Sequence, residues 1–182
     1  MQLKTKRLVI RDVKETDAEQ MVQGINHIEI SQYLRVVPHP YTRKDAKWFI
    51  QKSQKAAKEK PRTKYSLAII HNKKVVGCIG LESIDFYTGT AEIGYWLAKE
   101  HQQQGIMTEA VTAVIDFAFV KLKLQRVYAY ASSENIPSQK LLRKLGFTHE
   151  GTERRSVRMK ATGKHHDTHS YGLLKEEWRS RR

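Results

Sequence analysis

Residue types that could bind an anion come together in one stretch of the sequence. The apolar segment 91–97 is followed by a polar loop, by Gly105 and then by apolar residues at helical spacing. Backbone N–H groups at the start of a helix, together with the helix dipole, favour a negatively charged ligand. A phosphate could approach Gly105 closely because glycine has no Cβ. An ordinary turn glycine before a helix explains the same residues, and the spacing matches neither a Walker P-loop nor a dinucleotide fingerprint.

A carboxylate that could act as a general base, Glu92, lies within the apolar segment 91–97. On a strand it shares one side with Gly94 and Trp96. Burial would raise its pKa toward the range of a useful base. A structural carboxylate paired with Arg or Lys is an equal alternative. Gly94 is typical either of a bulge that frees a backbone N–H as an oxyanion donor, or of close packing.

Two further polar residues, Asn135 and Ser138, follow the apolar segment 126–131. The carboxyl end of a strand is the usual place for a ligand in sheets with parallel strands. The hydroxyl of Ser138 could donate a hydrogen bond to a leaving group. Helix capping explains the pair equally, because Asn135 has N-cap chemistry and Ser138 lies three residues later.

The hydrophobic pattern predicts the elements that would position these groups. Strand, crossover helix and strand over 91–131 indicate a parallel, right-handed unit. The segment 27–41 contains two prolines and is either a substrate-facing loop or a simple connection. We expect one domain, 1–182, with an α/β (α+β) mixed sheet and helices on both faces. The expected strands are 7–11, 65–70, 75–81, 91–97, 126–131, 147–159 and 166–174, and the expected helices end near Gly24, Lys58, Lys121 and Leu145.

Two motifs in this order resemble the acyl-CoA-binding core of the GCN5-related N-acetyltransferases. The first is Gln-x-x-Gly-x-Met at 102–107, and the second is Asn-x-x-Ser-x-x-Leu-Leu-x-x-x-Gly-Phe at 135–147. The resemblance covers nearly the whole chain and is strongest to the branch that contains the bacterial ribosomal-protein N-terminal acetyltransferases. It implies a mixed, mostly antiparallel sheet of six to seven strands. It also implies that strands 91–97 and 126–131 diverge at one end.

The same resemblance implies acetyl-CoA as cosubstrate and a primary amine as acceptor. The pantetheine arm would enter the V between the two diverging strands, and the phosphates would contact the amides of 103–108. Met107 stands where the family usually has Gly or Ala, so the loop is expected to be tight. The implied cofactor-binding residues are Ile93, Tyr95, Leu97, Gln102, Gln103, Gln104, Gly105, Ile106, Met107, Thr108, Asn135 and Ser138.

Proton transfer needs a donor other than the tyrosine that many family members use, because Leu142 occupies that position. We expect Ser138, one helical turn earlier on the same face, to donate a hydrogen bond to the leaving sulfur. We expect Glu92 to accept the proton of the amine. If Glu92 is structural, the base is to be sought near His169, Asp167 or Glu153.

No metal site is expected. His165 and His166 are adjacent on an expected strand and would point to opposite faces, and no carboxylate or thiolate set completes a zinc site. The single Cys78 is predicted to be a small buried hydrophobe, which agrees with a reducing compartment. The sequence carries no apolar signal segment and no run of the ~20 apolar residues that span a membrane. We therefore expect a cytoplasmic protein with no membrane partner.

The net charge of +14 bears on the partners of the protein. It fits a solvated basic surface, attraction of cofactor phosphates, or proximity to RNA, the ribosome or an acidic protein. It disfavours polyamine and aminoglycoside acceptors, which are polycations, unless the acceptor pocket is locally acidic. An α-amine has a pKa near ~8 against ~10.4 for lysine, and therefore needs only a mild base. We expect the N-terminus of a protein, by resemblance a ribosomal protein, as acceptor. A small amine acceptor and a non-catalytic RNA- or ribosome-binding module are the alternatives, and a homodimer stays open.

Overall fold

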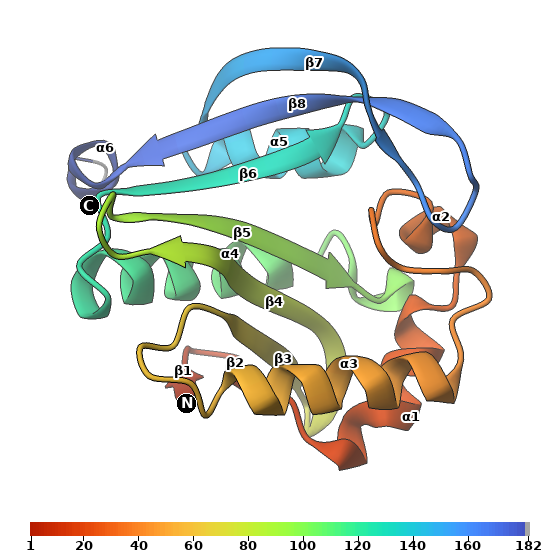
Figure 1. Cartoon of the computed structure of the whole chain (residues 1–182). Helices are drawn as coiled ribbons and strands as arrows, with labels where there is room; N and C mark the ends of the chain where they lie inside the picture. Colours follow the sequence, from red (N-terminus) through yellow and green to blue (C-terminus); the bar gives the residue numbers. More distant parts are fainter. Residues whose placement is uncertain (181–182) are drawn as a thin grey trace.

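A continuous sheet of eight strands forms the centre of the computed structural model, which describes residues 1–180 (Figure 1). The strand order is β1-β2-β3-β4-β5-β6-β8-β7. All neighbouring strands run antiparallel except β5 and β6, which are parallel. The strands are β1 (Gln2–Lys4), β2 (Leu8–Asp12), β3 (Tyr65–His71), β4 (Lys74–Asp85), β5 (Thr90–Leu97), β6 (Arg126–Ser132), β7 (Thr148–Arg158) and β8 (His165–Leu174).

The expected mixed, mostly antiparallel sheet is confirmed. It has eight strands in place of six to seven because the short strand β1 adds an edge that no periodic pattern marks. The helices are α1 (Ala18–Ile25), α2 (Ile28–Ser31), α3 (Arg43–Ala56), α4 (Ile106–Asp116), α5 (Ile136–Lys144) and α6 (Lys175–Arg179). The expected helix from Gly105 to Lys121 is α4 followed by a π-helical turn, Phe117–Lys121.

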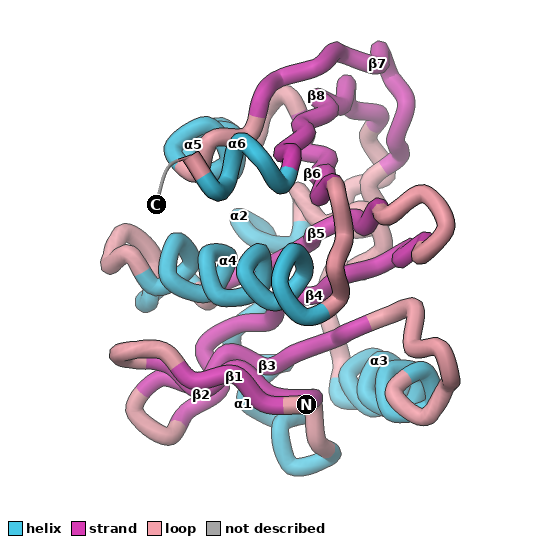
Figure 2. Tube along the Cα trace, turned by 90° about the vertical axis from the view of Figure 1, so that its left-hand side faces the viewer, coloured by secondary structure: helices cyan, strands magenta, loops and turns pink. Residues whose placement is uncertain are grey.

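Helices cover both faces of the sheet, as expected, and each face has its own apolar core. Figure 2 shows α4 and α3 on opposite sides of the strands. The larger core joins one face of the sheet to α4, α5 and α6, and the smaller joins the other face to α1, α2 and α3. In α4 the buried residues recur at the spacing of one helical face, which fixes that helix against the sheet. They include Ile106, Ala110, Val111, Val114 and Ile115.

The parallel pair β5–β6 is the feature that positions the site. Pairing runs only from Thr90↔Arg126 to Glu92↔Tyr128, at the start of both strands. Beyond Glu92 the two strands diverge, as expected (Figure 1). Among residues 1–180 no strand pairs with that side of β5 past this point. Its backbone groups are therefore available to another partner.

Local sequence signals explain several element boundaries. Thr42 and Asp45 form a capping box at the start of α3, with Asp45 N donating to Thr42 Oγ1 at 3.3 Å and Thr42 N donating to Asp45 Oδ2 at 2.9 Å. The short helix α2 lies in the segment 27–41, which the two prolines had marked as irregular. No helix within residues 1–180 is long and apolar enough to cross a membrane.

Candidate active site

A cavity of about 290 Å³ lies where β5 and β6 diverge. Its walls come from β5, β6, the start of α5, the end of β7 and the segment Tyr33–Val37 that follows α2. The segment 27–41 therefore supplies part of the cavity wall and is more than a connection. Most of the lining side chains are apolar. Among them are Ile25, Leu34, Val37, Phe49, Trp96 and Met159.

Two hydroxyl groups meet across the opening between the strands. Tyr95 Oη, from β5, lies 3.0 Å from Ser138 Oγ, in the first turn of α5. Burial raises the pKa of Tyr95 to about 12, so this hydroxyl keeps its proton at neutral pH and can donate it in a hydrogen bond. From the sequence, only the backbone of Tyr95 was expected to take part in the site. Strand alternation could have indicated the role of its side chain, because it turns Tyr95 to the side opposite Glu92 and toward α5.

The capping interpretation holds for one of the two residues at the start of α5. Asn135 Oδ1 accepts a hydrogen bond from Ser138 N at 3.2 Å and so caps the helix. The Ser138 hydroxyl is engaged with Tyr95 and takes no part in the cap. Leu142, one turn later, is fully buried in the larger core. Its position therefore contributes packing alone.

The carboxylate of Glu92 lines the cavity at the point where strand pairing stops. Burial raises its pKa above the ordinary value, while the nearby charge of Arg35 opposes that shift. Arg35 Nη2 lies 3.7 Å from Glu92 Oε1, and the Arg35 side chain is 56% exposed. This is an ion pair without a close hydrogen bond. Glu92 is thus partly buried, faces the cavity, and is only loosely paired.

Neither interpretation of Gly94 holds. Pairing of β4 with β5 continues without a bulge from Gly77↔Leu97 to Glu82↔Glu92. A Cβ at Gly94 would meet no atom within 4 Å, so close packing does not require glycine there. Free backbone groups on β5 arise instead from the loss of β6 as a partner. Gly94 simply leaves that part of the cavity wide.

The loop before α4 has the form of an anion site. Gly105 is the N-cap of α4 with φ +73°, and no side chain caps the helix. Within residues 1–180, the backbone amides from Gln103 to Thr108 donate to no protein acceptor. A Cβ at Gly105 would come near only the Arg7 guanidinium, at 3.5 Å. Consecutive free amides beside a cation make a concave site for phosphate oxygens.

The structure separates the predicted cofactor residues into two groups. Ile93, Tyr95, Asn135 and Ser138 line the cavity, whereas Leu97 and the loop 102–108 do not. The Leu97 carbonyl accepts a hydrogen bond from Gln102 Nε2 at 3.1 Å, and Gln104 Nε2 donates to the Glu100 carbonyl at 2.8 Å. The side chains of Ile106 and Met107 are buried, so these two residues offer only backbone to a ligand.

The other candidates for acid–base chemistry point elsewhere. His169 Nδ1 lies 2.7 Å from Thr152 Oγ1, and Asp167 Oδ1 accepts from Arg155 N at 2.7 Å. Neither these two residues nor Glu153 lines the cavity. Burial raises the pKa of Cys78, which therefore remains a protonated thiol, as expected of a buried hydrophobe. Residues 1–180 contain no group of three His, Cys, Asp or Glu side chains placed to hold a metal.

Comparisons with known proteins bear on this geometry. Residues 7–148 match the model of the acetyltransferase (GNAT) domain. The chain is 34% identical over 176 residues to the uncharacterized N-acetyltransferase p20 of Bacillus licheniformis, covering 97% of each. It is 34% identical over 83 residues to the ribosomal-protein-serine acetyltransferase of Escherichia coli, covering 46% of each. A solved structure of RimL, a ribosomal L7/L12 alpha-N-protein acetyltransferase in complex with coenzyme A, superimposes with a TM-score of 0.84 at 20% identity, covering 96% of this chain and 98% of that one.

Proposed function

Because the chain belongs to the GNAT family of N-acetyltransferases, we propose that it transfers the acetyl group of acetyl-CoA to the N-terminal α-amine of a protein. The observation that carries this proposal is the charge of the cavity lining. Its charged side chains are Arg35, Glu82 and Glu92. Glu82 Oε1 is held by Lys64 Nζ at 2.6 Å, which leaves Glu92 as the carboxylate able to receive an amine.

A single available carboxylate in an apolar cavity suits an acceptor that brings one amine and an uncharged first side chain, as a protein N-terminus can. A polyamine or an aminoglycoside carries several positive charges, and each would need its own acidic partner. An α-amine also loses its proton more easily than the amine of lysine, so a carboxylate with a modestly raised pKa suffices as base. As their names state, the E. coli relative and RimL act on ribosomal proteins. Both support a protein acceptor, ribosomal proteins included.

The residues present fit acetyl-CoA as cosubstrate. The free amides from Gln103 to Thr108, with Arg7 beside them, would hold its phosphates. The unpaired edge of β5 past Glu92 would hold its amide-containing arm, as a partner strand would. When bound, acetyl-CoA supplies the thioester whose acetyl carbon the amine attacks. The solved structure of RimL is a complex with coenzyme A, which supports this assignment.

The side chains of the cavity then divide the proton transfers between them. Glu92 takes a proton from the amine as the new C–N bond forms. Ser138 donates a hydrogen bond to the sulfur as the C–S bond breaks, and a solvent proton finally neutralises the thiolate. We assign the proton between the two hydroxyls to Tyr95, so that Tyr95 donates to the Ser138 oxygen and positions Ser138. The free amides on the edge of β5 offer donors to the developing oxyanion.

An acceptor panel of N-terminal peptides, spermidine and an aminoglycoside tests the proposal. We expect at least one peptide to be acetylated faster than either small amine. Faster turnover of spermidine than of every peptide would contradict a protein acceptor and favour a polyamine. Calorimetry addresses the remaining alternative, a basic module without catalysis. An absence of acetyl-CoA binding together with tight, salt-sensitive RNA binding would overturn the enzymatic proposal.

A further inference from the structure

The hairpin of β7 and β8 carries a basic surface beside the cavity. We call Arg154, Arg155, Arg158, Lys160 and Lys164 the basic hairpin surface. All five side chains are exposed. None of them forms an ion pair with any residue in the range 1–180. Lys160 lies near enough to Asp45 for its charge to lower the pKa of that carboxyl, but the surface as a whole keeps a positive field that a negatively charged partner can neutralise.

A bulge in β7 determines where the arginines of this surface point. Pairing with β8 is regular at Glu153↔Thr168 and resumes at Val157↔His166, so residues 154–156 lie opposite Asp167 alone. Arg155 is left-handed, with φ +51°, and its backbone N–H is held by Asp167 Oδ1 at 2.7 Å. A bulge of this kind redirects the side chains it carries. Here it turns two arginines away from the pairing plane and into solvent.

The basic hairpin surface adjoins the mouth of the cavity. Val157 and Thr168, which bound the bulge, both line the cavity. On the other wall Arg35 and Val36 are exposed lining residues, and the Lys160 backbone N–H donates to the Arg35 carbonyl at 3.3 Å. We take the opening beside the hairpin as the exit for a chain whose amine lies at Glu92. At ~3.3 Å per extended residue, its third to sixth residues lie about 7 to 17 Å from the amine, and these are the positions that we expect to meet the hairpin.

We propose that the basic hairpin surface binds acidic residues that follow the N-terminus of the acceptor protein. The inference rests on the proposed function and adds to it the class of acceptor sequence. A peptide fits this surface better than RNA does, because the hairpin segment 151–166 contains no Phe, Tyr or Trp on which a base could stack. The surface is also continuous with the acceptor cavity rather than separate from it.

Two peptides test the proposal against each other. They share their first two residues and differ at positions three to six, where one has Asp and Glu and the other has Ser and Gln. We expect kcat/KM to be about 10-fold higher for the acidic peptide in low salt, since each exposed charge pair contributes a few-fold. The advantage should shrink in 1 M salt, where the Debye length falls from ~10 Å at 0.1 M to ~3 Å.

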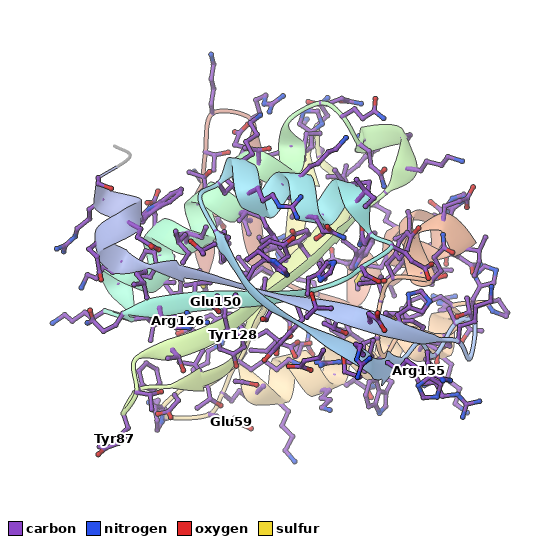
Figure 3. The ribbon with its side chains drawn as sticks, turned by 90° about the horizontal axis from the view of Figure 1, so that it is seen from above. Glu59, Tyr87, Arg126, Tyr128, Glu150 and Arg155 are labelled. Carbon is purple, nitrogen blue, oxygen red and sulfur yellow. The ribbon has the colours of Figure 1, made fainter. Side chains whose placement is uncertain are left out.

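Charge-reversal variants test whether the preference for the acidic peptide comes from the hairpin. In the double variant Arg154→Glu, Arg155→Glu the ratio of the two kcat/KM values should fall to about one or below. A second variant, Arg154→Glu with Lys164→Glu, avoids the left-handed position and should act alike. The matched control is Lys55→Glu with Lys58→Glu on and just after α3, which has the same change in net charge. These lysines are exposed and outside any ion pair in residues 1–180, and neighbouring Glu59 lies well away from Arg155 (Figure 3). The control should keep the full ratio.

The outcomes separate this inference from the proposed function. Equal rates for both peptides in the wild type, or an unchanged ratio in the hairpin variants, overturn the inference and leave the protein acceptor standing. Acetylation of spermidine with no acetylation of either peptide overturns both. Salt-sensitive binding of an RNA oligonucleotide that the hairpin variants lose, with a peptide ratio of one, would assign the surface to RNA.

Discussion

Tyr95 Oη and Ser138 Oγ lie 3.0 Å apart and join β5 to α5 across the opening where pairing between β5 and β6 has ended. This contact places a half-buried phenol next to the hydroxyl that we assign to the leaving sulfur. Tyr95 therefore supplies an aromatic hydroxyl beside Ser138, one helical turn before Leu142. The consequences can be measured one residue at a time.

Removing the Ser138 hydroxyl should slow chemistry without weakening cosubstrate binding. We expect Ser138→Ala to lower kcat by about 10²-fold, the lower end of what a general acid contributes. The affinity for acetyl-CoA, measured by calorimetry, should stay within about twofold. Ser133→Ala, in the loop before α5, is the matched control and should retain its rate. Full kcat in Ser138→Ala would mean that the sulfur leaves as a thiolate stabilised by backbone dipoles.

Tyr95→Phe keeps the ring and removes only the hydroxyl. We expect kcat to fall about 10-fold, equivalent to one hydrogen bond of ~1.4 kcal/mol. The melting temperature should change little, because the ring still fills its site. The decisive measurement is the double variant with Ser138→Ala. If Tyr95 acts through Ser138, the double variant is no slower than Ser138→Ala alone, whereas multiplied losses would contradict a positioning role.

Glu92→Gln should lower kcat by about 10²- to 10⁴-fold if Glu92 is the base. Wild-type kcat/KM should rise with pH as the Glu92 carboxylate ionises, and burial holds the pKa of this carboxylate above its ordinary value. In Glu92→Gln this rise of kcat/KM with pH should be absent. A raised pKa in the folded protein stabilises it below the pKa of the unfolded chain, and this stabilisation is lost as the pH rises through the folded pKa. At pH 7 the variant should therefore be at least as stable as the wild type. Lower stability with normal turnover would make the carboxylate structural and redirect the search to His169, Asp167 or Glu153.

Gly105→Ala tests the anion site. An alanine at φ +73° costs ~1 kcal/mol of folding free energy, and its Cβ would lie in the loop that we propose holds the phosphates, 3.5 Å from the Arg7 guanidinium. Gly163→Ala is the matched control. Gly163 has a similar φ of +69°, and an added Cβ would likewise have only an arginine nitrogen near it. Both variants should lose similar stability in denaturant. Only Gly105→Ala should weaken acetyl-CoA binding, by about 10-fold or more, and equal affinities would remove the phosphates from this loop.

Sequence patterns recovered the features that short stretches of chain determine. The strand at 91–97, the turn at Gly105 and the helix after it follow from local periodicity and backbone freedom. The contact between Tyr95 and Ser138 did not follow, because it depends on how far β5 and β6 stay paired before they diverge. The same holds for Arg35, which approaches Glu92 from a segment without periodicity. The strand β1 and the helix α2 are too short to leave a periodic signal.

The short pairing of β5 with β6 divides the sheet into two antiparallel parts that meet along a seam. One part is the meander β1 to β5, the other has the order β6-β8-β7, and only the pairs from Thr90 to Glu92 join the strands of the two parts. Side chains of α4 and α5 pack in the core on one face of this sheet, and we expect them to influence the angle of the seam. Substitutions in that packing can widen or narrow the acceptor slot while every residue of the site stays unchanged. The set of acceptors that such a protein accepts can therefore change through substitutions of core residues that do not contact an acceptor.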